Sequence, residues 1–132
     1  MECAGDRASS DFFERLSENY ANHPNVTPVN LAVSDVENDF MLFHVAQDAA
    51  GKYPKWLQGC ASVHVSRMND SIETACRLSG ARREVGDLVA TTIHAKRLDR
   101  ILSENNYNRI DILVIDVEGH EVAVLNSLSD PE

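Results

Sequence analysis

The stretch that most constrains the fold is IDILVID, residues 110–116, in which five of seven side chains are apolar. A strand with one face in water alternates apolar and polar residues, whereas a strand covered on both faces reads as a nearly continuous apolar run. We therefore predict that 110–116 is a central strand buried on both faces. Such strands are typical of parallel α/β sheets.

A helical pattern follows this run. After Gly119, the apolar residues Val122, Leu125 and Leu128 recur every third position, as on the inner face of a helix. We expect a helix that begins at Glu118 or Gly119, ends near Leu128 and packs on the sheet.

Acidic residues and a histidine occupy the turn between the predicted strand and helix. Asp116 ends the strand, and Glu118, His120 and Glu121 follow. In open α/β sheets, ligands bind beyond the carboxyl ends of the strands, and a helix N-terminus offers unpaired N–H groups there. The position alone leaves two interpretations open: Asp116 and Glu118 line a site, or they only cap the helix.

The rest of the chain alternates helix and strand signals. Ser9, Ser10 and Asp11 are candidate caps of a helix whose apolar face holds Phe13, Leu16 and Tyr20, and which Pro24 stops. Further predicted elements are strands at 29–33 and 40–45, which can form a hairpin, a strand at 88–95 and a helix that includes 98–102. For residues 47–86 the sequence pattern predicts mostly loop, with a short helix around 72–78.

The length and charge of the chain limit the classes of function that it can have. The 132 residues suffice for one domain at most. Twelve basic and 21 acidic residues give a net charge of −9, which disfavours nucleic acid as a partner. No apolar run predicts a membrane span, and the N-terminal residues do not resemble a signal peptide. Three widely spaced cysteines suit a reducing compartment, so we expect a cytoplasmic protein.

Three stretches together resemble one family. The stretch IDILVIDVEGHEVAVL is similar to the signature of FkbM-type methyltransferases, roughly I-D-L-L-K-I-D-V-E-G-x-E-x-x-V-L, although Val114 stands where the family commonly has lysine. Upstream, Leu98, Asp99 and Leu102 resemble the family's L-D-x-x-L element. The end of NVTPVNLAVSD, residues 32–35, resembles its A-V-S-D element.

The resemblance implies a Rossmann-like class I fold, with three αβα layers and a mostly parallel sheet, that binds S-adenosyl-L-methionine and methylates a substrate oxygen. In that family a glycine-rich turn after the first strand holds the methionine end of the donor. No G-x-G occurs in these 132 residues. We therefore expect a truncated domain: an interior piece that begins at the end of the second strand and binds the donor very weakly.

The resemblance also assigns roles to residues. Glu2 falls where the family's acidic ribose ligand ends the second strand, although a plain terminal residue is an equal alternative. Asp35 is a candidate neighbour of the adenine, or a simple turn residue. Asp116 would lie beside the cationic sulfonium, which a carboxylate attracts.

The roles of two further residues are less specifically assigned. Glu118 belongs either to the pocket or to the helix cap. His120 can act as the general base that takes the acceptor's hydroxyl proton, although a solvent-exposed helix histidine is the stronger reading. A metal cluster of Asp116, Glu118, His120 and Glu121 is disfavoured because no second group of ligands is evident elsewhere, so we predict no metal.

Two functions stay open. The first is S-adenosylmethionine-dependent methyl transfer, present here as a fragment and directed at a hydroxyl of a small molecule, glycan or lipid. The alternative is a non-catalytic α/β interaction module derived from the same fold. The acceptor and the oligomeric state are not encoded in any motif that we recognise.

Overall fold

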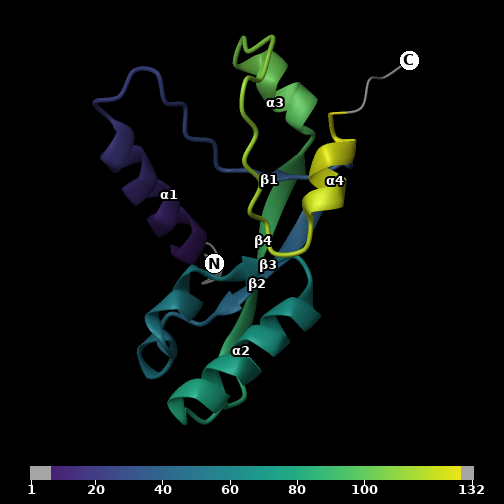
Figure 1. The fold of residues 1–132 in the computed structure, drawn as a ribbon. Coiled ribbons are helices and arrows are strands. Elements are labelled where there is room, and N and C mark those ends of the chain that lie inside the picture. Colours follow the sequence, from purple (N-terminus) through teal and green to yellow (C-terminus); the bar gives the residue numbers. More distant parts are fainter. Residues whose placement is uncertain (1–6, 129–132) are drawn as a thin grey trace, which may run out of the picture.

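The computed structural model describes residues 7–128 and folds them into helices around a small mixed sheet (Figure 1). In chain order the elements are α1 (Arg7–Tyr20), β1 (Ala32–Val33), β2 (Asp39–Val45), η1 (Ala50–Lys52), η2 (Lys55–Gly59), β3 (Ala61–Ser62), α2 (Val65–Ser79), β4 (Leu88–Lys96), α3 (Leu98–Glu104) and α4 (Glu121–Asn126). The α/β class is confirmed.

The sheet has the strand order β1-β4-β2-β3. Only β1 and β4 run parallel, whereas β2 is antiparallel to both of its neighbours. The prediction of a mostly parallel sheet is therefore wrong. The predicted hairpin between 29–33 and 40–45 is wrong as well, because β4 lies between the two strands, and only Ala32–Val33 of the first forms a ladder.

The longest ladder joins β2 and β4, from Asp39↔His94 to Val45↔Leu88. Both strands are rich in the β-branched and aromatic residues that fit a pleated surface. The predictions for β2, β4 and α3 are confirmed, with bounds within one or two residues of those expected.

Helix α2 supplies most of the core that the sequence did not predict. Met68, Ile72 and Ala75 are buried at helical spacing on one face. Gly80 ends the helix in the left-handed conformation, with φ of 73°, and its N–H bonds to the carbonyl of Cys76. These side chains pack with Val45, Ala46, Ala49, Tyr53 and Leu57. The prediction of mostly loop over 47–86 is wrong.

A buried carboxylate closes the base of this core. Asp87 accepts hydrogen bonds from the Tyr53 hydroxyl at 2.6 Å and from the backbone N–H of Glu84 at 2.8 Å, and it pairs with the Lys52 ammonium at 2.6 Å. Burial alone would raise the pKa of Asp87, but these partners outweigh it and lower the pKa to about 2. Burial, and then the hydrogen bond to Asp87, raises the pKa of Tyr53 to about 12.

The predicted central strand is the largest error. Residues 110–116 are extended but belong to no ladder in the described part of the chain. Ile112 and Val114 are each 84% exposed, and Leu113 is also exposed. Figure 1 shows the segment running back from α3 towards α4. Its apolar run therefore lacks the flanking strands that burial on both faces requires.

The flanking helices are only partly packed. Helix α4 follows Gly119 as predicted but is short, and Val124 is its buried residue, whereas Val122 and Leu125 of the predicted inner stripe are exposed. Helix α1 is confirmed, although it begins at Arg7, ahead of the predicted caps, and ends at Tyr20, ahead of Pro24. It lies to one side of the sheet in Figure 1, and the predicted face residues Leu16 and Tyr20 remain exposed.

Candidate functional site

Two distant segments meet where β1 ends and α4 begins. Ser34 follows β1 and is 1% exposed, and His120 is the N-cap residue of α4. The Ser34 Oγ lies 3.0 Å from the Nε2 of His120. Ser34 also contacts the neighbouring Asp35, whose Oδ1 is 3.2 Å from the hydroxyl.

These contacts assign the tautomer of His120. A serine hydroxyl has one hydrogen, and Ser34 donates it to the Asp35 carboxylate. We therefore assign Nε2–H of His120 as the donor of the hydrogen bond to the Ser34 hydroxyl oxygen. In neutral His120 the lone pair is therefore on Nδ1, which faces the Nε2 of His64 at 3.4 Å.

His64 and Phe40 flank the His120 ring. The ring centroids of His64 and His120 are 5.4 Å apart, and Phe40 contacts His120 edge to face at 5.8 Å. His64 is the exposed N-cap residue of α2, whereas His120 is half-buried. His120 is therefore not fully solvent-exposed, and its role as a general base stays a prediction.

The turn before α4 has an unusual backbone. Glu118 and Gly119 both have positive φ, at 50° and 102°. A Cβ on Gly119 would lie 3.0 Å from the Nε of Arg67, so both the φ and the space favour glycine here. The Ser62 hydroxyl holds the turn by donating to the Glu118 carbonyl at 3.1 Å.

Glu121 stabilises the same turn from the first position of α4. Its Oε1 accepts a hydrogen bond from Gly119 N–H at 3.0 Å. This N–H, and then the N–H of Glu121 itself, lower the pKa of the Glu121 carboxyl. Neither Asp116 nor Glu118 is the N-cap residue of α4, because His120 holds that position. His120 makes no side-chain capping hydrogen bond, so the side-chain contact at the helix start comes from Glu121.

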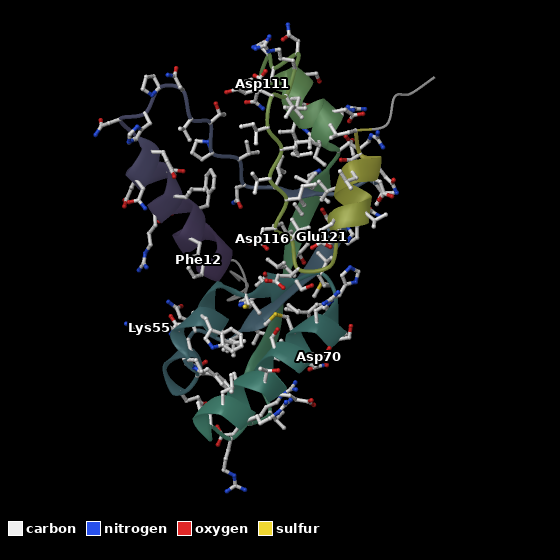
Figure 2. All side chains as sticks on the ribbon, viewed as in Figure 1. Phe12, Lys55, Asp70, Asp111, Asp116 and Glu121 are labelled. Carbon is white, nitrogen blue, oxygen red and sulfur yellow. The ribbon has the colours of Figure 1, made fainter. Side chains whose placement is uncertain are left out.

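Asp116 and Glu118 are exposed beside this turn. Figure 2 shows Asp116 and Glu121 together at the end of the extended segment, with Asp111 at its other end near α3. Burial, followed by the nearby carboxylates of Glu118 and Asp116, raises the pKa of the Cys60 thiol. The acidic pair thus lies close to β3 as well as to α4.

Arg97 connects the elements that carry the family-like motifs. It donates to the carbonyl oxygens of Asp35 and Ser127 at 3.1 and 3.2 Å, and it pairs with Asp99 at 2.9 Å. The hydrogen bond from Arg97 is the main cause that lowers the pKa of Asp99. Asp99 of the L-D element therefore helps to join β1, α3 and α4.

A cavity of about 420 Å³ lies on the α1 side of the sheet. Apolar side chains from α1 and β2 line it, among them Phe12, Leu42 and Val45, together with the polar residues Arg15 and His44. Cys60 also lines it. Its volume falls within the range of small-molecule sites.

The structure groups some of the predicted site residues and adds others. Asp35, Glu118 and His120 belong to one cluster around the turn, with Asp116 at its exposed edge, whereas Glu2 lies outside the described residues. Ser34 and His64 were not predicted. Ser34 lies within the quoted A-V-S-D element, so its motif offered a signal, whereas nothing in the sequence links His64 to residue 120.

Comparison with known families agrees with this arrangement of motifs. The model of the methyltransferase FkbM domain matches residues 8–131, which is nearly the whole chain. The protein is thus of the methyltransferase class, and it belongs to the FkbM methyltransferase domain family. No curated protein and no solved structure shows a significant match. None of the described helices has the length and hydrophobicity that crossing a membrane requires.

Proposed function

We propose that the chain is part of an S-adenosylmethionine-dependent O-methyltransferase. The observation that carries this proposal is the family match over residues 8–131. S-adenosylmethionine, when bound, supplies an electrophilic methyl group on a cationic sulfonium. The free cysteines Cys60 and Cys76 support a reducing compartment, and we place the protein in the cytoplasm.

Carboxylates at the turn are the proposed donor-binding groups. Asp116 and Glu118 are exposed and lie near each other, as their shared influence on Cys60 indicates, so they offer negative potential to a sulfonium. Asp35 lies next to Ser34 and is the proposed neighbour of the adenine. We keep Glu2 as the proposed ribose ligand. This set suits a cationic ligand, although no glycine-rich turn accompanies it in these residues.

His120 is the proposed general base. As the acceptor oxygen bonds to the methyl carbon and the carbon–sulfur bond breaks, the hydroxyl proton must leave. Nδ1 of His120 carries the lone pair that can accept this proton, because Nε2–H is held by Ser34. His64 is exposed and lies 3.4 Å away, so it offers a route by which the proton reaches solvent.

The acceptor is proposed to be a hydroxyl compound that enters the cavity between α1 and β2. The cavity combines apolar walls with the polar side chains of Arg15 and His44. A small molecule, or the end of a glycan or lipid, suits this volume.

Titration of the ¹⁵N-labelled chain with S-adenosylmethionine tests the proposal. We expect weak binding, in the millimolar range, with chemical shift changes at residues 33–35 and 116–121. Asp116→Asn should weaken binding about tenfold, the equivalent of one lost charge-assisted hydrogen bond. Asp111→Asn is the matched control, because Asp111 is exposed at the far end of the same segment, and it should bind like the wild type.

Two outcomes would contradict these assignments. If millimolar S-adenosylmethionine shifts no resonance at the turn, these residues do not form a donor site in the chain as it stands. If Asp111→Asn and Asp116→Asn weaken binding equally, Asp116 acts only through overall charge. Micromolar affinity would instead show that the glycine-rich turn is dispensable.

One observation favours the second candidate, a non-catalytic interaction module. Ile112 and Val114 expose apolar side chains on an unpaired extended segment, which is typical of an interaction surface. The same titration separates the two functions, because a module that has lost donor binding gives no shifts at residues 116–121.

A further inference from the structure

We propose that His64 and His120 form a binding site for a late first-row divalent cation, with Zn²⁺ as its natural probe. The proposal rests on the geometry of the two imidazoles and on the hydrogen bonds that orient them. It does not depend on methyl transfer or on S-adenosylmethionine.

The spacing of the two ring nitrogens fits a shared metal ion. The Nδ1 of His120 and the Nε2 of His64 are 3.4 Å apart. In a tetrahedral site with Zn–N bonds of about 2.0–2.1 Å, two ligand nitrogens lie about 3.3–3.4 Å apart. In the metal-free chain Nε2–H of His64 donates to Nδ1 of His120, and the ion takes the place of that hydrogen when His64 shifts to the tautomer with its lone pair on Nε2.

The hydrogen bonds that Ser34 and Asp35 form on the Nε2 side of His120 orient the lone pair on its Nδ1. Metal-bound histidines usually donate their other N–H to an oxygen, which fixes both the tautomer and the ring orientation. Here Nε2–H of His120 donates to the buried Ser34 hydroxyl, and Ser34 donates to Asp35. Nδ1 of His120 therefore keeps its lone pair directed at His64.

A second buried serine fixes the backbones of both ligands. Ser62 is 2% exposed, and its Oγ accepts a hydrogen bond from the backbone N–H of His64 at 3.0 Å. The same hydroxyl donates to the carbonyl of Glu118, two residues before His120, at 3.1 Å. The start of α2 and the turn before α4 are thus joined at one side chain, which holds the two imidazoles near each other.

Surrounding charges set the strength of the site. Glu118 and Glu121 lie on the same turn and favour a cation, whereas Arg67 packs against Gly119 and opposes one. Among the described residues, no three His, Cys, Asp or Glu side chains converge on one point. The site therefore has two protein ligands and leaves the remaining positions to water. Imidazole ligands select Zn²⁺, Ni²⁺ or Cu²⁺ over Mg²⁺ and Ca²⁺.

The metal and the proposed base compete for the same lone pair. A cation on Nδ1 of His120 prevents that atom from accepting a proton. Metal binding and general-base catalysis by His120 are therefore exclusive at any moment, and each can be tested without the other.

Isothermal titration of the tag-free 132-residue chain with Zn²⁺ tests the proposal. We expect one equivalent to bind, and His64→Gln and His120→Gln each to weaken that binding at least tenfold. Ser34→Ala should weaken it several-fold, because Nε2–H loses the acceptor that fixes the tautomer. His23→Gln is the matched control for an exposed histidine, and Cys60→Ser is the control for the nearby thiol. Both should bind like the wild type.

Chemical shift mapping keeps the test valid if a histidine variant folds poorly. Zn²⁺ added to the ¹⁵N-labelled wild type should move the imidazole resonances of His64 and His120, and Mg²⁺ should not. Loss of binding in Cys60→Ser, equal loss in His23→Gln, or full binding by both His64→Gln and His120→Gln would each overturn the proposal. So would Zn²⁺-induced shifts at His23 or Cys60 in place of the histidine pair.

Discussion

Two regions of this molecule differ in burial, and the one with the more apolar sequence is the more exposed. In the half built from β2, β4, η2 and α2, Leu57 and Ile72 are fully buried. In the extended segment 110–116, Ile112 and Val114 are almost fully exposed. The difference therefore does not come from hydrophobicity.

Pairing of the backbone explains the contrast. The strands β2 and β4 form a continuous ladder from Asp39↔His94 to Val45↔Leu88, and α2 covers side chains on that sheet. Segment 110–116 has the same kind of side chains, but it has no ladder partner among the described residues. Unpaired N–H and C=O groups must remain near water, which keeps their side chains there too. An apolar run becomes a buried strand only when neighbouring strands satisfy its backbone.

The largest effect on stability is expected from a substitution in the core of the packed half. Ile72→Ala removes methyl and methylene groups from a fully buried site and should lower the free energy of unfolding by about 2–5 kcal/mol. That is a large share of the roughly 5–15 kcal/mol typical of a domain. Urea denaturation measures it, and Ile72→Val, expected to lose about 0.5–1.5 kcal/mol, serves if the alanine variant does not fold. A loss below about 0.5 kcal/mol for Ile72→Ala would contradict this core.

The second prediction concerns how the buried carboxylate Asp87 makes the stability of the packed half depend on pH. The pKa of Asp87 is about 2 in the folded protein and near the ordinary aspartate value of 3.8 when unfolded. Protonation is therefore easier in the unfolded chain. The stability that Asp87 contributes is complete above about pH 4 and is lost as the pH falls towards 2. Urea midpoints across this range should fall less steeply for Asp87→Asn than for the wild type, and Asp111→Asn should follow the wild type closely.

The sequence predicted elements with strong local patterns and missed those that depend on distant partners. The strand at 88–95 and the helix at 98–102 carry their own periodicity, and both are confirmed. Helix α2 was predicted only in part, as a short helix around 72–78, because polar residues separate its few buried positions, Met68, Ile72 and Ala75. The strand at 110–116 was wrong for the opposite reason, since its pattern is strong but it forms no ladder within residues 7–128.

The residues of the candidate site also fall into two groups, those that sequence motifs predicted and those that depend on contacts between distant segments. The motifs led to Asp35, Asp116, Glu118 and His120, because they occupy fixed places beside predicted strand ends. His64 could not be found, since its relation to His120 depends on how α2 and the turn before α4 come together through Ser62. The family match rests on the motifs, and it holds although Leu113, within the longest motif, is exposed.

The smallest expected effect comes from repeating the core substitution in the exposed segment. Ile112→Ala removes the same atoms as Ile72→Ala, but at a side chain that is already in water, so the free energy of unfolding should change by less than about 0.5 kcal/mol. Amide hydrogen exchange supplies a second measure, because unpaired N–H groups at 110–116 should exchange far faster than those of the β2–β4 ladder. A loss of about 2 kcal/mol or more, together with slow exchange at these amides, would show that the segment is paired and packed in solution. The contrast between the two regions would then disappear.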